Sequence, residues 1–299
     1  YLLHPYLSLY TGRGCPAQCT FCLWPQTIAG HKYRVRSPQT VAAEMAYLKR
    51  LFPQVREFFF DDDTFTANLP RAREIAQRLR PLGLAWSCNS RANLDADTVR
   101  FFKDCGLRLF LVGYESGNAQ ILKNIKKGVT LEEMRRFTRA CHDAGVVIHG
   151  TFVLGLPIET PQTIEESIRF AQELDMFSMQ VSLAAPYPGT ELYEMARQNG
   201  WFVKRDKTDL VEPDGFQQSA LEYPGLSKDA IFEAVDRFYR AYYLRPKPIL
   251  RIIKTMLEDK EVFVRRCREG FEFFKSLRQR KADLAAARSG ASTPAPAGV

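Results

Sequence analysis

Strand-like and helix-like stretches alternate along the first two hundred residues, and this alternation constrains the fold more than any other feature of the sequence. Six apolar runs rich in β-branched and aromatic residues predict strands, and stretches with apolar residues every three or four positions predict helices between them. The strands are predicted at residues 6–12, 55–61, 83–90, 107–115, 146–155 and 177–186. Six strand–helix units in series predict an α/β fold with a parallel sheet and right-handed crossovers.

Polar or Gly/Pro-rich stretches follow the carboxyl ends of all six predicted strands. They are a cysteine-bearing loop at 11–27 and the segments "DDDTF", "CNSRAN", "YESGN", "GLPIET" and "PYPGT". In a barrel the six stretches would converge on one mouth, whereas an open doubly wound sheet would gather them at a single switch point. Because all six ends carry such residues, we expect a partial (β/α)6 barrel of the TIM type, with its site at that mouth.

The strand–helix rhythm stops after Trp201, so the sequence predicts a change of architecture there. We expect the barrel to span residues 1–200, and an irregular connection followed by amphipathic helices, a C-terminal helical extension, to span 201–281. Residues 282–299 are rich in Ala, Ser, Pro and Gly and predict a disordered tail. The chain starts with Tyr1 rather than Met, and we expect it to be part of a longer polypeptide.

The basic charge of the chain is confined to one segment. The whole sequence carries a net charge of +8, yet residues 245–281 alone hold twelve Lys and Arg against five Asp and Glu. The barrel region is therefore nearly neutral, which argues against nucleic acid as a partner. Apolar side chains interleave with the basic ones in this segment. We therefore expect peripheral contact with a membrane surface, with an ordinary solvated helix as the alternative.

Cysteine usage and hydropathy indicate a cytoplasmic protein. No run of about 18 apolar residues is present, so no transmembrane helix is predicted. Seven cysteines are an odd number, and four of them lie singly among apolar neighbours, which does not suit a secreted disulfide framework. We therefore expect a reducing, cytoplasmic setting, with any membrane contact made at the inner surface through residues 245–281.

The other three cysteines, Cys15, Cys19 and Cys22, lie within eight positions on the loop after the first predicted strand. Thiolates are soft ligands that suit zinc and iron–sulfur centres. Three interpretations are open: incidental cysteines, a zinc site completed by His31, and a [4Fe–4S] cluster held by three thiolates. In the last case one iron has no protein ligand, and an open coordination position is what makes a metal site catalytic.

The C-x3-C-x2-C spacing, with Phe21 directly before the last cysteine, resembles the signature of the radical S-adenosylmethionine (SAM) superfamily. The resemblance implies that the three cysteines bind a [4Fe–4S] cluster and that the amino and carboxylate groups of SAM occupy its open iron. It also implies that an electron from the reduced cluster, supplied by a flavodoxin or ferredoxin, cleaves SAM to methionine and a 5′-deoxyadenosyl radical. That radical then abstracts a hydrogen atom from the substrate.

The same resemblance implies SAM contacts at other strand ends. Asp62 or Asp63 would receive the amino group, and because neighbouring strand residues point in opposite directions, only one of the two would face inward. Arg91 would hold the carboxylate through its two-pronged guanidinium. Glu115 would contact the ribose or the amino group, and Phe21 is a further SAM contact.

The segment "VLGLPIET" at the end of the fifth strand matches the turn that lies against the adenine in related proteins. The resemblance implies that Gly155 and Pro157 shape this turn, and ordinary turn chemistry is the alternative. On the same strand His149 alternates with Thr151, and we interpret His149 as a core histidine.

Residues 5–200 as a whole are similar to radical SAM enzymes that carry an N-terminal cobalamin-binding domain. The similarity runs through "FFFDDDTF", "WSCNSRANLD" and "PYPGTELYEMARQNGW". It implies cobalamin as a further cofactor, held by an N-terminal domain that this chain lacks. No D-x-H-x-x-G stretch, the usual cobalamin-ligand motif, occurs in the sequence.

The loop "CTFCLWPQT" most resembles the hopanoid-biosynthesis radical SAM proteins (HpnJ-like). This implies a hopanoid lipid as substrate and rearrangement of its glucosamine headgroup into a cyclitol ether. The first alternative is a cobalamin-dependent radical SAM C-methyltransferase acting on a lipid or natural product. The second, from another class, is a non-catalytic zinc or iron–sulfur protein.

Overall fold

The computed structural model describes residues 2–203, 219–258, 263, 264, 268, 270 and 271. The chain forms two compact units, residues 1–239 and 240–299, and each is described by itself. The first unit holds the sheet and its helices and continues past residue 200, where we expected the barrel domain to end. The predicted tail at 282–299 lies outside the described residues.

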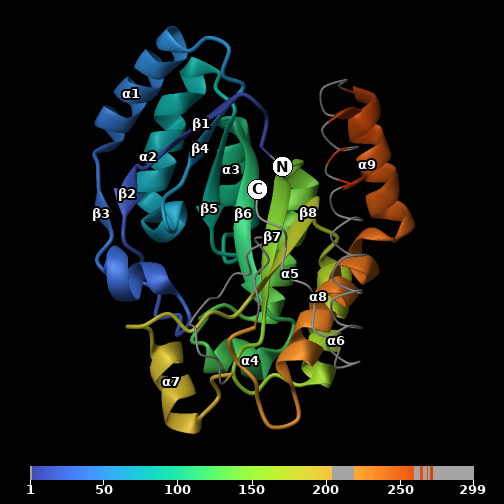
Figure 1. Ribbon diagram of the computed structural model, residues 1–299. Coiled ribbons are helices and arrows are strands. Elements are labelled where there is room, and N and C mark those ends of the chain that lie inside the picture. The colour runs from blue at the N-terminus through green and yellow to red at the C-terminus, as the bar shows by residue number, and fades with distance from the viewer. Residues whose placement is uncertain (1, 204–218, 259–262, 265–267, 269, 272–299) are drawn as a thin grey trace, which may run out of the picture. The chain divides into compact units, whose positions relative to one another are not determined.

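Six parallel strands form the central sheet of the first unit (Figure 1). They are β1 (Tyr6–Leu9), β4 (Glu57–Phe60), β5 (Trp86–Ser90), β6 (Leu107–Glu115), β7 (Val147–Leu154) and β8 (Ser178–Leu183). Their order in space follows their order in the chain, and every neighbouring pair is parallel. A doubly wound sheet would reverse its strand order at a switch point. The predicted partial (β/α)6 barrel is therefore confirmed, as a curled half-barrel with β1 and β8 at its edges.

Helices follow the strands of this half-barrel, and the last of them comes after β8 rather than between two strands. They are α1 (Pro38–Leu51), α2 (Leu69–Leu79), α3 (Ala96–Asp104), α4 (Ala119–Asn124), α5 (Leu131–Ala144), α6 (Pro161–Leu174) and α7 (Glu191–Asn199). Two short 3-10 turns, η2 (Phe65–Ala67) and η3 (Arg80–Leu82), flank α2. The helix α8 (Lys228–Tyr243) begins in the first unit and ends in the second.

Local sequence sets where these helices begin. The Ser37 hydroxyl accepts a hydrogen bond from the Thr40 N–H at 3.1 Å, and Pro38 follows at the first helical position of α1. At α5, Thr130 and Glu133 form a reciprocal capping box, with each side chain accepting from the backbone N–H of the other. Such caps satisfy backbone groups that the helix itself leaves unpaired.

The core is an aromatic cluster on the helix-covered side of the sheet. Trp86 of β5 lies with its ring centroid 5.6 Å from that of Phe60 and 5.8 Å from that of Phe102 on α3. Phe110 of β6 continues the cluster at 6.4 Å from Phe102 and 5.5 Å from Phe137 on α5. All five side chains are fully buried. Burial of each stabilises the fold by about 1.5–3 kcal/mol, and this layer holds the strands at fixed positions.

The other face of the sheet lines the inside of the half-barrel. Asn89 on β5 lies beside Leu111 on β6, and Gly113 on β6 lies beside Thr151 on β7 in the parallel register. Because successive strand residues point to opposite faces, these four positions alternate with the core residues. The inner face is therefore more polar and holds smaller side chains than the helix-covered face.

The described part of the second unit contains the end of α8 and the helix α9 (Pro246–Glu258). It lies in the segment predicted to be amphipathic. Leu250, Ile253 and Leu257 are exposed along it. No described helix is long and apolar enough to cross a membrane.

Candidate active site

The cysteine-bearing loop follows β1 and returns through a short antiparallel pair, β2 (Gly12–Arg13) and β3 (Arg34–Val35). Between the two strands the chain forms one π-helical turn, η1 (Trp24–Ile28). The Cys15 N–H donates to the Gly30 carbonyl at 3.2 Å, which closes the loop on itself. Gly14 has a φ of 94°, and a Cβ there would collide with the Lys32 carbonyl oxygen. The backbone of the loop can therefore adopt this conformation only with glycine at position 14.

One side chain, Gln26, organises this loop from within. Its amide nitrogen donates to the carbonyl oxygens of Cys19 at 3.0 Å, Thr20 at 3.1 Å and Cys22 at 2.9 Å. Its amide oxygen accepts from the Glu191 N–H at the start of α7, at 2.7 Å. Gln26 thus ties the second and third cysteines to a helix about 165 residues further along the chain. No spacing rule singles out a lone glutamine, and the sequence analysis missed it.

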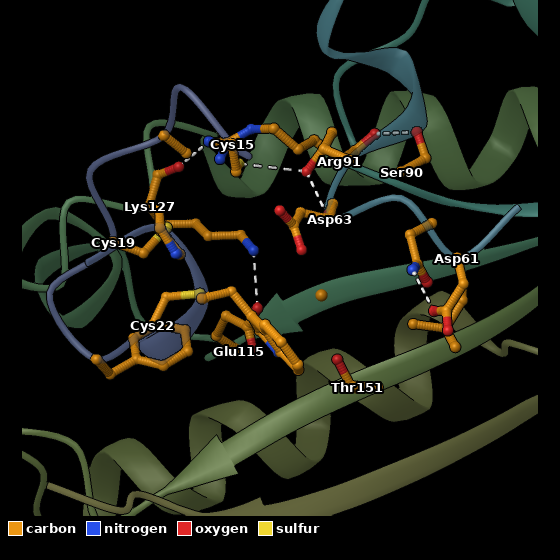
Figure 2. Close-up of a pocket in the computed structure, with 18 of the residues that line it drawn as sticks. Cys15, Cys19, Cys22, Asp61, Asp63, Ser90, Arg91, Glu115, Lys127 and Thr151 are labelled. Carbon is orange, nitrogen blue, oxygen red and sulfur yellow. Dashed lines mark hydrogen bonds and ion pairs between the residues drawn. The ribbon is translucent and has the colours of Figure 1, made fainter. Parts of the chain in front are cut away.

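The three thiols line a cavity of about 450 Å³ at the carboxyl ends of the strands. Figure 2 shows the cysteines on one side of this cavity and Asp61 on the other, with Asp63, Glu115 and Thr151 between them. Most of the predicted cofactor-binding residues line the cavity, namely Cys15, Cys19, Cys22, Phe21, Asp63, Arg91 and Glu115. At least four of the six stretches after the strands therefore meet at one cavity, as predicted: the cysteine loop, "DDDTF", "CNSRAN" and "YESGN".

The cysteines are free thiols with little access to solvent. Cys15 and Cys19 are buried, and Cys22 is half-buried. The Cys15 sulfur lies 3.5 Å from the Thr64 hydroxyl oxygen. Burial raises the pKa of the Cys22 thiol to about 12 in the metal-free protein, and coordination to iron would deprotonate it.

The geometry argues against the zinc site completed by His31. His31 does not line the cavity, and its Nδ1 lies 3.1 Å from the Ala17 carbonyl oxygen and 3.4 Å from the Gln18 amide nitrogen. Among the described residues, no three His, Cys, Asp or Glu side chains converge where a single metal ion could bind. Thiolates of a [4Fe–4S] cluster each bind a different iron and need not converge on one point. The donor set therefore fits the cluster better than a single zinc ion.

The three adjacent aspartates after β4 have different partners, and Asp62, one of the two predicted SAM contacts, does not line the cavity. Asp62 is fully buried. Its carboxylate accepts from the Thr11 N–H, the Thr11 hydroxyl and the Tyr33 hydroxyl, each at 2.6 Å. These three bonds hold the start of the cysteine loop, and the buried carboxylate has no surface on the cavity.

Asp63 does line the cavity. One of its oxygens accepts from the Gly14 N–H at 2.8 Å, which places the carboxylate beside the cysteine loop. Partial burial raises its pKa above the ordinary value, and the charges of Asp62 and Asp61 raise it further. A cationic ligand group would offset both the burial of this carboxylate and its repulsion by the neighbouring aspartates. Of Asp62 and Asp63, Asp63 is therefore the better candidate to contact an amino group.

Arg91 and Glu115 reach the cavity from the ends of β5 and β6. The Arg91 guanidinium donates to the Lys127 carbonyl oxygen. Glu115 has a left-handed backbone with a φ of 68° and a buried side chain that accepts from Lys127 Nζ at 2.7 Å. Lys127 therefore links both predicted residues. It was missed because it follows α4 rather than a strand, outside the set of strand ends.

The turn after β7 does not reach this cavity, so a SAM contact for Gly155 and Pro157 remains a prediction. Gly155 has a φ of 81°, its N–H donates to Glu159 Oε2 at 2.5 Å, and its carbonyl accepts from the Tyr223 hydroxyl at 2.7 Å. These bonds give the turn a defined shape from within. Elsewhere on β7, His149 is buried beside the Ser178 hydroxyl, as predicted.

Aromatic side chains complete the thiol end of the cavity. Phe21 lies between the second and third cysteines, and Trp24 follows on η1 with half of its surface exposed. Together with Pro25 they form an apolar border at the side where the thiols lie. Such a border limits the access of water to a charged centre.

Comparisons with known proteins agree with this site. A sequence model of the Radical SAM superfamily matches residues 9–171. An uncharacterized methyltransferase of Pyrococcus horikoshii is 31% identical over 271 residues, 89% of this chain and 57% of the relative. Cytidylyl-2-hydroxyethylphosphonate methyltransferase of Streptomyces wedmorensis is 29% identical over 249 residues, 80% of this chain and 46% of the relative. This chain thus spans about half the length of these relatives.

Two further comparisons bear on the fold and on the predicted hopanoid substrate. The radical SAM methyltransferase TsrM of Kitasatospora setae, solved with tryptophan and a SAM analogue, has a TM-score of 0.67 at 18% identity over 79% of this chain and 52% of that one. The likeness shows a shared fold. Hopanoid C-2 methylase of Rhodopseudomonas palustris is 22% identical over 212 residues, 68% of this chain and 40% of the relative. The HpnJ-like resemblance is therefore not confirmed. Since the superfamily match covers more than half of the chain, including all three cysteines of the cavity, this chain belongs to the Radical SAM superfamily.

Proposed function

We propose that this chain is the catalytic part of a cobalamin-dependent radical SAM methyltransferase. The observation that carries the proposal is that two relatives, 31% and 29% identical over 89% and 80% of this chain, are named methyltransferases. The TsrM methyltransferase, which shares the fold, has been solved with cobalamin and a [4Fe–4S] cluster bound. In this proposal a separate domain of the polypeptide would hold the cobalamin, because no ligand motif for it occurs in the chain.

Methyl transfer replaces the hopanoid headgroup rearrangement as the proposed reaction. As a member of the superfamily the chain is an enzyme with a [4Fe–4S] cluster and SAM as cofactors. The hopanoid relative is more distant than the two methyltransferases and is itself named a methylase. Methyl transfer, the alternative reaction of the sequence analysis, is therefore the better supported one, and the names of the two methyltransferases give no support for a lipid substrate.

Cys15, Cys19 and Cys22 would hold the cluster in this proposal. Their thiols lie on one loop, line one cavity and are shielded by Phe21 and Trp24. When bound, the cluster supplies the electron for cleavage of SAM. The loop itself contributes the shape, since Gln26 holds the carbonyl groups of Cys19 and Cys22 in place.

The charges around the thiols suit the methionine part of SAM, which carries both an ammonium and a carboxylate. Asp63 and Glu115 offer carboxylates for the ammonium, and Arg91 offers a guanidinium for the carboxylate. Lys127 orients Glu115 through their ion pair, at 2.7 Å. These residues bind and orient the ligand next to the thiols, and the apolar border excludes water.

Anaerobic reconstitution tests the proposal. We expect about four iron and four sulfide per chain. With a flavodoxin, a ferredoxin or dithionite as reductant, we expect release of 5′-deoxyadenosine from SAM. With reduced cobalamin and deuteromethyl-labelled SAM added, we expect labelled methylcobalamin, which mass spectrometry detects.

Replacement of the three cysteines by alanine is the control and should abolish iron binding and every SAM-derived product. Cleavage of SAM without methylation of cobalamin, in the polypeptide that includes the cobalamin-binding domain, would reject the methyltransferase and leave another radical SAM reaction. Zinc in place of iron, or no SAM cleavage at all, would reject the proposal altogether.

A further inference from the structure

We propose that Asp61, Tyr10 and Asn89 form a substrate subsite at the end of the cavity away from the thiols, and that this subsite binds a protonated amine of the substrate. The inference rests on the proposed function, because it names the substrate class of the same cavity. It concerns residues that neither the cluster nor the SAM contacts use. Figure 2 shows Asp61 across the cavity from Cys15, Cys19 and Cys22.

The hydrogen bonds of the three adjacent aspartates show which one is free to bind a ligand. Asp62 uses its carboxylate in three bonds of 2.6 Å, and Asp63 is bound to the cysteine loop at 2.8 Å. Asp61 makes only long contacts, at 3.4 Å, with the Ser8 hydroxyl and the Asn89 amide nitrogen. A carboxylate has about four acceptor positions, so Asp61 retains acceptor capacity toward the cavity it lines.

The neighbours of Asp61 offer acceptors as well. The Asn89 amide nitrogen donates to the Asp62 carbonyl oxygen at 3.0 Å and faces Asp61 at 3.4 Å, so its donors are directed to the protein. Its remaining polar group is a carbonyl oxygen, which can only accept. Tyr10 lines the same cavity, and burial together with the charges of Asp61 and Asp63 raises the pKa of its phenol. A phenol oxygen carries lone pairs, so Tyr10 can accept a hydrogen bond from a ligand in this cavity.

The charge of the subsite selects among ligands that can donate hydrogen bonds. The carboxylate of Asp61 is the charged group of the subsite that lines the cavity, while the Arg13 guanidinium lies 5.1 Å from the centroid of the Tyr10 ring and does not line it. Lys127 and Arg91 lie with the thiols at the other end of the cavity in Figure 2. A charge-assisted hydrogen bond from an ammonium to a carboxylate is about twice as strong as a neutral one. An amine should therefore bind more tightly here than an alcohol, and a carboxylate should be repelled by Asp61. Leu111 beside Asn89 adds apolar surface for the body of the ligand.

Three probes that share one ring test this chemistry: phenethylamine, 2-phenylethanol and phenylacetate. Each is measured by equilibrium dialysis against the reconstituted full chain with SAM bound and no reductant. The wild type should bind the amine most tightly and the acid least. The change Asp61→Asn keeps the shape of the side chain and removes its charge. It should weaken amine binding about tenfold and change alcohol binding less than about twofold.

Two further variants make the outcome specific. Asp97→Asn makes the same chemical change on the exposed face of α3 and should leave the order of the three probes unchanged. Tyr10→Phe removes the phenol and should reduce the preference for the amine with Asp61 still present. Iron content and thermal unfolding show that each variant is folded and loaded.

Equal binding of the three probes by the wild type, or an amine preference that survives Asp61→Asn, would overturn the subsite. Absence of amine binding would overturn it too. These dialysis measurements involve no turnover, whereas the proposed function depends on SAM cleavage and methyl transfer. Failure of the one is therefore distinguishable from failure of the other.

Discussion

Lys127 Nζ lies 2.7 Å from Glu115 Oε1, and both side chains keep less than a tenth of their surface exposed. The pair lies on the wall of the cavity, where Glu115 has a left-handed backbone. Gly113 makes room for it, because a Cβ there would collide with Glu115 Oε1 and lie 3.0 Å from Lys127 Nζ. A buried charge is tolerated only with a partner, so each residue of the pair depends on the other.

Replacement of Lys127 by methionine should leave the Glu115 carboxylate buried and unpaired. We expect a loss of about 3–5 kcal/mol in the free energy of unfolding, measured by urea denaturation. Lys126→Met is the matched control, because Lys126 pairs with Glu191 where both side chains are about half exposed. That change should cost less than about 1 kcal/mol.

Adding Glu115→Gln to Lys127→Met should recover part of the stability, because no buried charge remains. If Lys127→Met costs no more than Lys126→Met, the pair does not stabilise this wall. SAM affinity measured on the same proteins then reports whether the orientation of Glu115 matters to the ligand.

Replacement of Gln26 by alanine should loosen the cysteine loop and leave the barrel intact. Three carbonyl groups would lose their donor, and each such bond contributes about 1 kcal/mol. We expect the reconstituted protein to lose iron to a chelator about tenfold faster, followed by the decay of its visible absorption. Gln26→Glu should lose iron faster than Gln26→Ala, because it places carboxylate oxygens against the three carbonyl oxygens.

Gln39→Ala is the control for this experiment. Gln39 is exposed on α1, where its amide donates to Glu74 at 3.1 Å. Its loss should leave the rate of iron release unchanged. Equal rates of iron release in Gln26→Ala and in the wild type would show that the loop holds its shape without the glutamine.

The sheet and much of the cavity were predictable because they depend on periodicity. Six apolar runs specify six strands, and parallel strands bring their carboxyl ends together, which places Asp63, Arg91 and Glu115 in one region. Strand alternation also predicts that only one of Asp62 and Asp63 faces inward. It does not say which, and the choice depends on Thr11 and Tyr33, whose contacts with Asp62 cross about 51 and 29 positions of the chain.

Lys127 and Gln26 were not predictable for a related reason. Lys127 lies after a short helix, and Gln26 within a π-helical turn, so neither occupies a position that strand periodicity defines. Their roles come from partners that are distant in sequence or lie on the backbone. Glu115 is 12 positions away from Lys127, and Gln26 bonds to carbonyl groups, which every residue has. Only the tertiary structure shows such contacts.

The carboxyl group of Glu159 makes stability depend on pH. Burial raises its pKa from the ordinary 4.5 to about 8, although the N–H groups of Gly155 and Leu156 donate to it. Because the folded-state pKa is the higher one, the stabilisation is complete below about pH 4.5 and is lost as pH rises through about 8. Between these values the free energy of unfolding should fall by up to about 1.4 kcal/mol per pH unit from this group.

Glu159→Gln should remove this pH dependence. Urea denaturation of both proteins at about pH 5 and about pH 8 measures it. The free energy of unfolding of the variant, relative to that of the wild type, should be higher at about pH 8 than at about pH 5. Comparing this stability difference at the two pH values cancels any destabilisation by the amide that does not depend on pH. Parallel stability curves for the two proteins would mean that Glu159 ionises normally in the fold.

The apolar face of α9 leads to the last prediction, which concerns the proposed peripheral contact with a membrane. Leu250, Ile253 and Leu257 are 65%, 46% and 80% exposed, and they alternate with basic residues along the helix. An amphipathic basic helix binds anionic lipid through buried apolar area and through charge. We expect the full chain to co-sediment with vesicles that contain phosphatidylserine, and to bind less at high salt.

Replacement of Leu250, Ile253 and Leu257 by serine should weaken vesicle binding by tenfold or more, at about 25 cal/mol for each Å² of apolar area removed from the interface. Leu51→Ser is the control: Leu51 is 52% exposed on α1, so the change removes a similar apolar surface outside α9. Vesicle binding that is the same for the triple variant and the wild type would place the contact elsewhere or exclude it. Binding that falls equally with Leu51→Ser would show a general effect of surface apolarity rather than a surface formed by α9.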